Sequence, residues 1–135
     1  EAIKSGADEA IMLNMNGMVV EGTAENIFLV RDNTLITPPV ASGALEGITR
    51  STVLSIADHI GIDFQIRDIT RDELYYADEV FLTGTAAGIK SIGEIDKIII
   101  ANGKVGKIAT QLQELYYQIV HGEIEKYEKW LTYVN

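Results

Sequence analysis

Residues 18–30, MVVEGTAENIFLV, decide the fold of the surrounding chain. Two apolar runs, at residues 18–20 and 27–30, are typical of neighbouring β-strands. The insert between them is longer than a tight turn requires, and it carries two carboxylates, Glu21 and Glu25. Glu21 follows the first run directly, so its position calls for a reason beyond turn formation.

Short apolar or alternating runs continue on both sides of this segment. The turn signal Asn16-Gly17 predicts a hairpin before it, and Asp32-Asn33 predicts a turn after it. Residues 62–69 alternate apolar and polar side chains, which predicts a half-buried strand. The full set of predicted strands covers residues 9–13, 18–21, 26–30, 35–37, 62–69 and 79–83, with two more short strands within 89–100.

Two longer segments have helical periodicity. Apolar residues recur at helical spacing over residues 48–60, and Gly61 closes this predicted helix. Residues 108–127 predict a long amphipathic helix. These two principal helices and the mostly antiparallel strands indicate the α+β fold class, in one domain without internal repeats.

Shorter helical signals flank them. Thr70 and Glu73 form a capping-box pattern ahead of a short helix at residues 71–76. Residues 1–6 are typical of the last turns of a helix that ends at a glycine. Because a protein rarely starts in this way, we expect residues 1–135 to be part of a longer protein.

Composition narrows the range of functions. The chain has 135 residues, with 20 acidic against 11 basic side chains and a net charge of -9, which argues against nucleic acid or an anionic membrane as a partner. There is no cysteine, and the two histidines lie far apart in sequence, so we expect no metal site. No apolar run is long enough to span a membrane, and we expect a cytoplasmic protein.

Two loops have the composition of an anion-binding site. Residues 45–50, LEGITR, place Gly47 at the mouth of a helix, where backbone N–H groups favour a phosphate and Thr49 adds a hydroxyl. Residues 83–87, TGTAA, follow a strand with two hydroxyls and small residues that let backbone amides approach a ligand. Taken singly, each pattern is more often an ordinary cap or turn.

The carboxylates and Asn26 also have simple structural interpretations. Glu21 and Glu25 can be exposed carboxylates at a strand end, and Asn26 can stabilise a turn. One carboxylate combined with two amide-rich loops would nevertheless suit a cationic heterocycle that carries a phosphate, because such a cofactor needs an acceptor at its ring nitrogen and a helix N-terminus at its phosphate.

These segments, with their spacing, resemble the class IV (fold type IV) pyridoxal-phosphate aminotransferases. Within that family, the end of the chain and the doublet Ala86-Ala87 are most similar to branched-chain amino acid aminotransferases. The segments that carry the resemblance are residues 21–28 (EGTAENIF), 35–37 (LIT), 45–50 (LEGITR), 78–87 (DEVFLTGTAA) and 128–134 (EKWLTYV). The resemblance covers essentially residues 1–135, as the larger, C-terminal, cofactor-binding domain of the family.

The resemblance implies a role for each matching residue. Glu21 is similar to the glutamate that keeps the pyridine nitrogen of pyridoxal 5'-phosphate protonated, and Leu45 to the residue packed against the ring. Gly47, Ile48 and Thr49 resemble the phosphate-binding start of a helix.

The second loop matches in the same way. Gly84 and Thr85 resemble further cofactor contacts, and the amides of Thr85 and Ala86 resemble those that meet the substrate carboxylate. Glu25 belongs to the motif, and we expect it to be structural.

Two positions depart from the family pattern. The Schiff-base lysine should lie upstream of Glu1, so we expect no catalytic residue in this chain and no transamination by it alone. Lys4 is out of place, and Lys90 is a weak alternative nucleophile. Residues 88–91, GIKS, replace an expected glutamate, apolar residue, threonine and proline, which leaves the substrate pocket undefined.

The resemblance therefore implies transfer of the amino group of leucine, isoleucine or valine to 2-oxoglutarate by a ping-pong route, in a homodimer or larger homo-oligomer. D-amino acid aminotransferase and aminodeoxychorismate lyase share Glu21 and the loops, so both remain open. A fragment without catalysis that binds a phosphate or cofactor is the remaining alternative.

Overall fold

The computed structural model of the chain describes residues 1–122. Its helices are the 3-10 turns η1 (Ile3–Ser5) and η2 (Val40–Ser42) and the α-helices α1 (Ile48–Ile60), α2 (Arg71–Tyr76) and α3 (Lys107–Val120). Its strands are β1 (Ile11–Leu13), β2 (Val19–Gly22), β3 (Asn26–Arg31), β4 (Thr34–Thr37), β5 (Phe64–Ile66), β6 (Glu79–Gly84), β7 (Gly88–Ser91), β8 (Glu94–Ile95) and β9 (Ile98–Ile99). None of the helices described here is long and apolar enough to cross a membrane.

A five-stranded sheet organises these elements. Its strand order is β5-β4-β3-β6-β7, and every pair is antiparallel except β4 with β5. The central strand β3 is buried from Asn26 to Val30, so both faces of the sheet are covered. β1–β2 and β8–β9 form two separate two-stranded ribbons.

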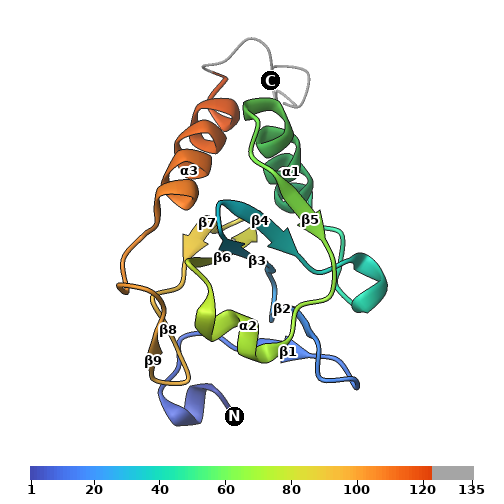
Figure 1. Cartoon of the computed structure of the whole chain (residues 1–135), viewed down its shortest axis with the longest axis vertical. Coiled ribbons are helices and arrows are strands. Elements are labelled where there is room, and N and C mark those ends of the chain that lie inside the picture. Colours follow the sequence, from blue (N-terminus) through green and yellow to red (C-terminus); the bar gives the residue numbers. More distant parts are fainter. Residues whose placement is uncertain (123–135) are drawn as a thin grey trace.

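The sheet separates two hydrophobic cores, and different elements cover its two faces (Figure 1). On one face, α1 and α3 lie over a core that contains Phe28 and Phe81, whose rings stack with centroids 5.2 Å apart. The other face carries α2, the β1–β2 ribbon and the β8–β9 ribbon, over a core that includes Ile27, Leu29 and Leu82. Alternation along β3 thus sends successive side chains to different layers.

A carboxylate from the sheet sets the start of α3. Glu79 in β6 accepts hydrogen bonds from the backbone N–H groups of Ile108 and Ala109, at 3.1 and 2.9 Å. These groups have no partner within a helix, so the carboxylate caps them and complements the helix dipole. A Cβ on Gly106 would lie 2.0 Å from Glu79 Cδ, so only glycine fits there. This contact fixes α3 relative to the sheet.

The structure confirms the α+β fold class, with two principal helices and mostly antiparallel strands. It confirms the helix at Ile48–Ile60 with Gly61 as its left-handed cap, and the capping box ahead of α2. Asp32 and Asn33 have φ values of 50 and 61°, as a tight turn between antiparallel strands requires.

Two predictions about individual elements are wrong. The predicted half-buried strand at residues 62–69 is reduced to β5, and all three of its side chains are exposed, because β5 lies at the edge of the sheet. Residues 89–100 contain three strands rather than two, since the turn at Asp96 and Lys97 folds β8 onto β9. The predicted helix end at residues 1–6 is confirmed, since η1 is a 3-10 turn that Gly6 caps with a φ of 86°.

The last helix is also shorter than predicted. α3 ends at Val120, where the N–H groups of His121 and Gly122 bond back to carbonyls of the final turn. Gly122 has a φ of 69°, which favours termination. The predicted continuation beyond residue 122 and the family-like ending at residues 128–134 lie outside the described residues.

Candidate functional site

The predicted site residues converge at one end of the central strands β3 and β6. β3 starts there and the antiparallel β6 ends there, so Asn26 pairs with Thr83 in the ladder. The turn after Glu21 therefore lies beside the loop after Gly84: a Cβ on Gly84 would lie 3.0 Å from Glu25 Cγ. The structure thus brings together two segments that are some sixty residues apart.

Glu21 is held by the loop that precedes α1. Its Oε2 accepts a hydrogen bond from the backbone N–H of Leu45 at 3.1 Å. The carbonyl of Leu45 accepts a second bond, at 2.7 Å, from Nδ2 of Asn26, which is 6% exposed. The backbone of Leu45 is therefore fixed on both sides, while its side chain is 75% exposed.

Glycine is required at position 47 because a larger side chain would clash with Asn26, and not because of its backbone conformation. Its φ of -76° suits any residue, but a Cβ would lie 2.2 Å from Oδ1 of Asn26. Glycine lets the buried Asn26 side chain reach across to Leu45. The Glu21 turn, the Leu45 loop and the start of α1 are thus joined through one amide side chain.

The start of α1 presents backbone donors. Gly47 is the N-cap and makes no side-chain cap hydrogen bond, so the first N–H groups of the helix are available to an anion. Ile48 is 80% exposed, whereas Thr49 is buried. Arg50 is also buried and donates to the carbonyl of Pro38 at 3.2 Å, and burial lowers the pKa of its guanidinium, with an opposing effect of Glu46.

Tyr116 in α3 touches both loops. Its hydroxyl lies 3.4 Å from the Thr49 Oγ1. On the other side its ring lies against Gly88, where a Cβ would come within 3.5 Å of Cε1. Gly88 has a φ of 64° and ends the turn that contains the exposed residues Thr85 and Ala86. Tyr116 therefore holds the second loop against the start of α1.

Sequence reasoning missed the roles of Asn26 and Tyr116. Asn26 does not stabilise its own turn; it bonds to a residue 19 positions away. Tyr116 was identifiable only as part of the apolar face of a helix. Neither contact has a local signal, because each depends on how distant elements come together.

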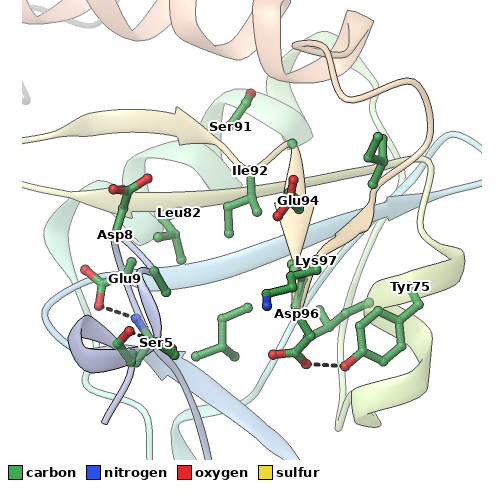
Figure 2. Close-up of a pocket in the computed structure, with 18 of the residues that line it drawn as sticks. Ser5, Asp8, Glu9, Tyr75, Leu82, Ser91, Ile92, Glu94, Asp96 and Lys97 are labelled. Carbon is green, nitrogen blue, oxygen red and sulfur yellow. Dashed lines mark hydrogen bonds between the residues drawn. The ribbon is translucent and has the colours of Figure 1, made fainter.

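A large cavity lies in a different part of the molecule. It has a volume of 1170 Å³ and lies on the sheet face of the second core, between the N-terminal segment and the β8–β9 ribbon (Figure 2). Lys90 lines it, and Glu21, Leu45, Gly47 and Thr49 do not. Lys90 pairs with Leu82 in the ladder and points away from Thr49 and Tyr116, while Lys4 is exposed in η1. Neither lysine joins the candidate site.

The residues at this end of β3 and β6, with the start of α1, fit a flat cationic ring that carries a phosphate. Glu21 supplies an acceptor, the start of α1 supplies anion-binding donors, and the exposed side chains of Leu45 and Ile48 supply apolar surface. Two buried polar atoms at the same end, Thr83 Oγ1 and Glu25 Oε2, have no hydrogen-bond partner among the described residues. Such atoms are costly unless a further group satisfies them.

Residues 1–95 match the family described as amino-transferase class IV. The chain belongs to this family. Among curated relatives, it is 50% identical over 133 residues to a probable branched-chain-amino-acid aminotransferase of Aquifex aeolicus, and 46% identical over 135 residues to a branched-chain-amino-acid aminotransferase of Pseudomonas aeruginosa. These alignments cover 98% and 100% of this chain but 43% and 44% of the relatives.

Solved structures of branched-chain amino acid aminotransferases have the same fold as this chain. The branched-chain amino acid aminotransferase of Thermobaculum terrenum, in its PLP-form (holo-form), superposes with a TM-score of 0.94 at 43% identity. The enzyme of Thermoproteus uzoniensis, with norvaline, gives 0.92 at 52%. Both matches cover 97% of this chain, and they cover 43% and 44% of those chains. The chain thus spans less than half the length of these relatives.

Proposed function

We propose that residues 1–135 are the C-terminal, cofactor-binding domain of a pyridoxal-phosphate-dependent aminotransferase for branched-chain L-amino acids. The proposal includes 2-oxoglutarate as amino acceptor, a homodimeric assembly and a cytoplasmic location. It is supported by relatives that are named branched-chain-amino-acid aminotransferases and are more than twice as long as the chain. In the complete protein, the Schiff-base lysine would come from residues that precede Glu1.

The observation that carries the proposal is the hydrogen bond from the Leu45 amide to Glu21, beside the uncapped start of α1. An ionised Glu21 would hold a proton at the pyridine nitrogen of the cofactor. Bound pyridoxal phosphate supplies an electron sink for the α-carbon of an amino acid. Without an acceptor such as Glu21, the ring nitrogen would lose its proton more readily.

The remaining residues would bind and orient. The N–H groups of Ile48 and Thr49, with the Thr49 hydroxyl, would hold the phosphate at the start of α1, where Gly47 allows close approach. Leu45 would cover one face of the ring. Thr85 would add a further phosphate contact beyond Gly84.

The same loop would meet the substrate. Backbone amides of Thr85 and Ala86, both exposed at the turn between β6 and β7, would bind a carboxylate. Because Tyr116 touches Gly88 and Thr49, this loop and the phosphate-binding helix start would keep a fixed relative position.

An activity assay on the full-length protein tests the proposal. We expect turnover of leucine, isoleucine and valine with 2-oxoglutarate, and a fall in kcat of at least about 100-fold for Glu21→Ala, since a charge-stabilising contact is lost. Glu114→Ala, on the exposed face of α3, is the control and should retain activity.

Two results would contradict the proposal. Turnover of D-alanine or aminodeoxychorismate in place of the branched-chain substrates would assign a different member of the family. Unchanged kcat in the Glu21→Ala variant would remove the role given to this carboxylate.

A further inference from the structure

A second carboxylate, Glu9, holds the turn that follows Glu21. Glu9 precedes β1, and its Oε1 accepts a hydrogen bond from the neighbouring Ala10 N–H at 2.8 Å. The same oxygen accepts two hydrogen bonds from Thr23, one from the backbone N–H at 3.3 Å and one from the hydroxyl. One residue of the N-terminal segment thus binds both donors of Thr23.

This contact continues the β1–β2 ribbon beyond its last pair. Met12 pairs with Glu21 and Ile11 with Gly22, so Glu9 and Thr23 lie just past the end of the ladder. β2 is not a strand of the five-stranded sheet, and the turn from β2 to β3 is closed by the Gly22 N–H to Glu25 carbonyl bond at 2.7 Å. The Glu9 carboxylate adds an anchor outside that turn.

The hydrogen bonds at Glu9 are strongest when its carboxylate is ionised. An ionised carboxylate is an acceptor only, and charge-assisted hydrogen bonds are stronger than neutral ones. The hydrogen bond from the Thr23 hydroxyl, followed by that from the Ala10 amide, lowers the pKa of Glu9, and Lys90 contributes in the same direction. Glu9 therefore remains charged at neutral pH.

Glu9 acts at a distance from the candidate cofactor site. Figure 2 shows it at the wall of the large cavity, on the sheet face away from α1 and α3. Glu21 is held from the other direction by the Leu45 amide. Two contacts therefore hold the C-terminal end of β2. Thr23 donates hydrogen bonds to Glu9, and the Leu45 amide donates one to Glu21.

We propose that Glu9 is a positioning residue for Glu21: its hydrogen bonds to Thr23 fix the turn after β2 and so aim the Glu21 carboxylate at the cofactor. This role rests on the function proposed above. It predicts that losing the Glu9–Thr23 contact weakens cofactor binding and reduces protonation of the cofactor ring, although neither residue touches the cofactor.

The test uses the full-length protein and pyridoxamine 5'-phosphate, which binds without a covalent bond to lysine. Glu9→Gln removes the charged acceptor, and Thr23→Val removes the hydroxyl donor. Each should weaken binding by about five- to tenfold, as loss of a charge-assisted hydrogen bond would. Combining the two should cost less than the sum of the two single effects, because both weaken the hydrogen bond between the same two side chains.

Two control variants separate this role from general destabilisation. Thr23→Ser keeps the hydroxyl and should bind like the unmodified protein. Asp8→Asn changes the exposed neighbouring carboxylate and should also have no effect. Two further measurements apply to the Glu9→Gln and Thr23→Val variants. Amide hydrogen exchange at Thr23 in the absence of cofactor should be faster than in the unmodified protein. The ¹⁵N shift of the bound ring nitrogen should move toward that of the neutral form.

The outcomes distinguish the two proposals. If the unmodified protein binds pyridoxamine 5'-phosphate with a protonated ring, and the two variants match it in affinity and ring shift, Glu9 has no positioning role. If the unmodified protein does not bind pyridoxamine 5'-phosphate, the proposed function fails and the role of Glu9 fails with it. Weaker binding in both variants, with rescue by Thr23→Ser, supports the role.

Discussion

At the start of α1, Asn26 occupies the space that a side chain on residue 47 would fill. Its Oδ1 would lie 2.2 Å from an added Cβ, and its Nδ2 holds the Leu45 carbonyl. A single methyl group at Gly47 therefore has to displace a buried amide. The same displacement would release the loop whose N–H binds Glu21.

Gly47→Ala should accordingly lower the free energy of unfolding by about 1–3 kcal/mol, the usual cost of overpacking. Urea denaturation followed by circular dichroism measures this change. Gly22→Ala is the matched control, because its Cβ would meet its nearest neighbour at an ordinary 3.4 Å. In an Asn26→Ala background the clash is absent, so an equal cost there would refute the explanation.

The first turn of α2 is held by hydrogen bonds and an ion pair of Glu73. Glu73 Oε2 accepts a 2.7 Å hydrogen bond from the Thr70 N–H, and Glu73 Oε1 lies 2.8 Å from Arg67 Nη2. Burial raises the pKa of Glu73, but hydrogen bonds from Arg67 and Thr70 outweigh it and the net pKa is below the ordinary value of 4.5. The ionised form therefore stabilises the folded state.

The contribution of Glu73 to stability should decrease at low pH. With the folded pKa below 4.5, the contribution of Glu73 is fully present above that value and is lost as the pH falls through the folded pKa. Glu73→Gln should lower the unfolding free energy by about 0.5–1 kcal/mol at pH 7, since the pair with Arg67 is partly exposed.

Urea denaturation at pH 7 and at pH 3 measures this effect. The difference between Glu73→Gln and the unmodified protein should shrink at the lower pH. Glu94→Gln, at an exposed position in β8, controls for the loss of one charge. A difference that is the same at both pH values would contradict the assignment.

Across the whole molecule, sequence signals that act within a few residues predicted the helix ends and tight turns correctly. The capping residues, Gly61 and the Asp32-Asn33 turn each act within a few residues, so α1, α2 and the β3–β4 hairpin were predictable. The exposure of β5 was not, because it depends on its place at the sheet edge beside β4. The candidate site follows the same division: its motif residues are contiguous in sequence and could be proposed from it, whereas the contacts of Asn26, Tyr116 and Glu9 join distant segments and could not be predicted.

In the proposed function, the whole arrangement of strand, loop and helix would place Glu21 at a cofactor ring. Its most direct test is the ¹⁵N shift of the pyridine nitrogen of ¹⁵N-labelled pyridoxamine 5'-phosphate bound to the full-length protein. We expect a protonated ring nitrogen in the unmodified protein and a neutral one in Glu21→Gln. An identical shift in both proteins would contradict the account.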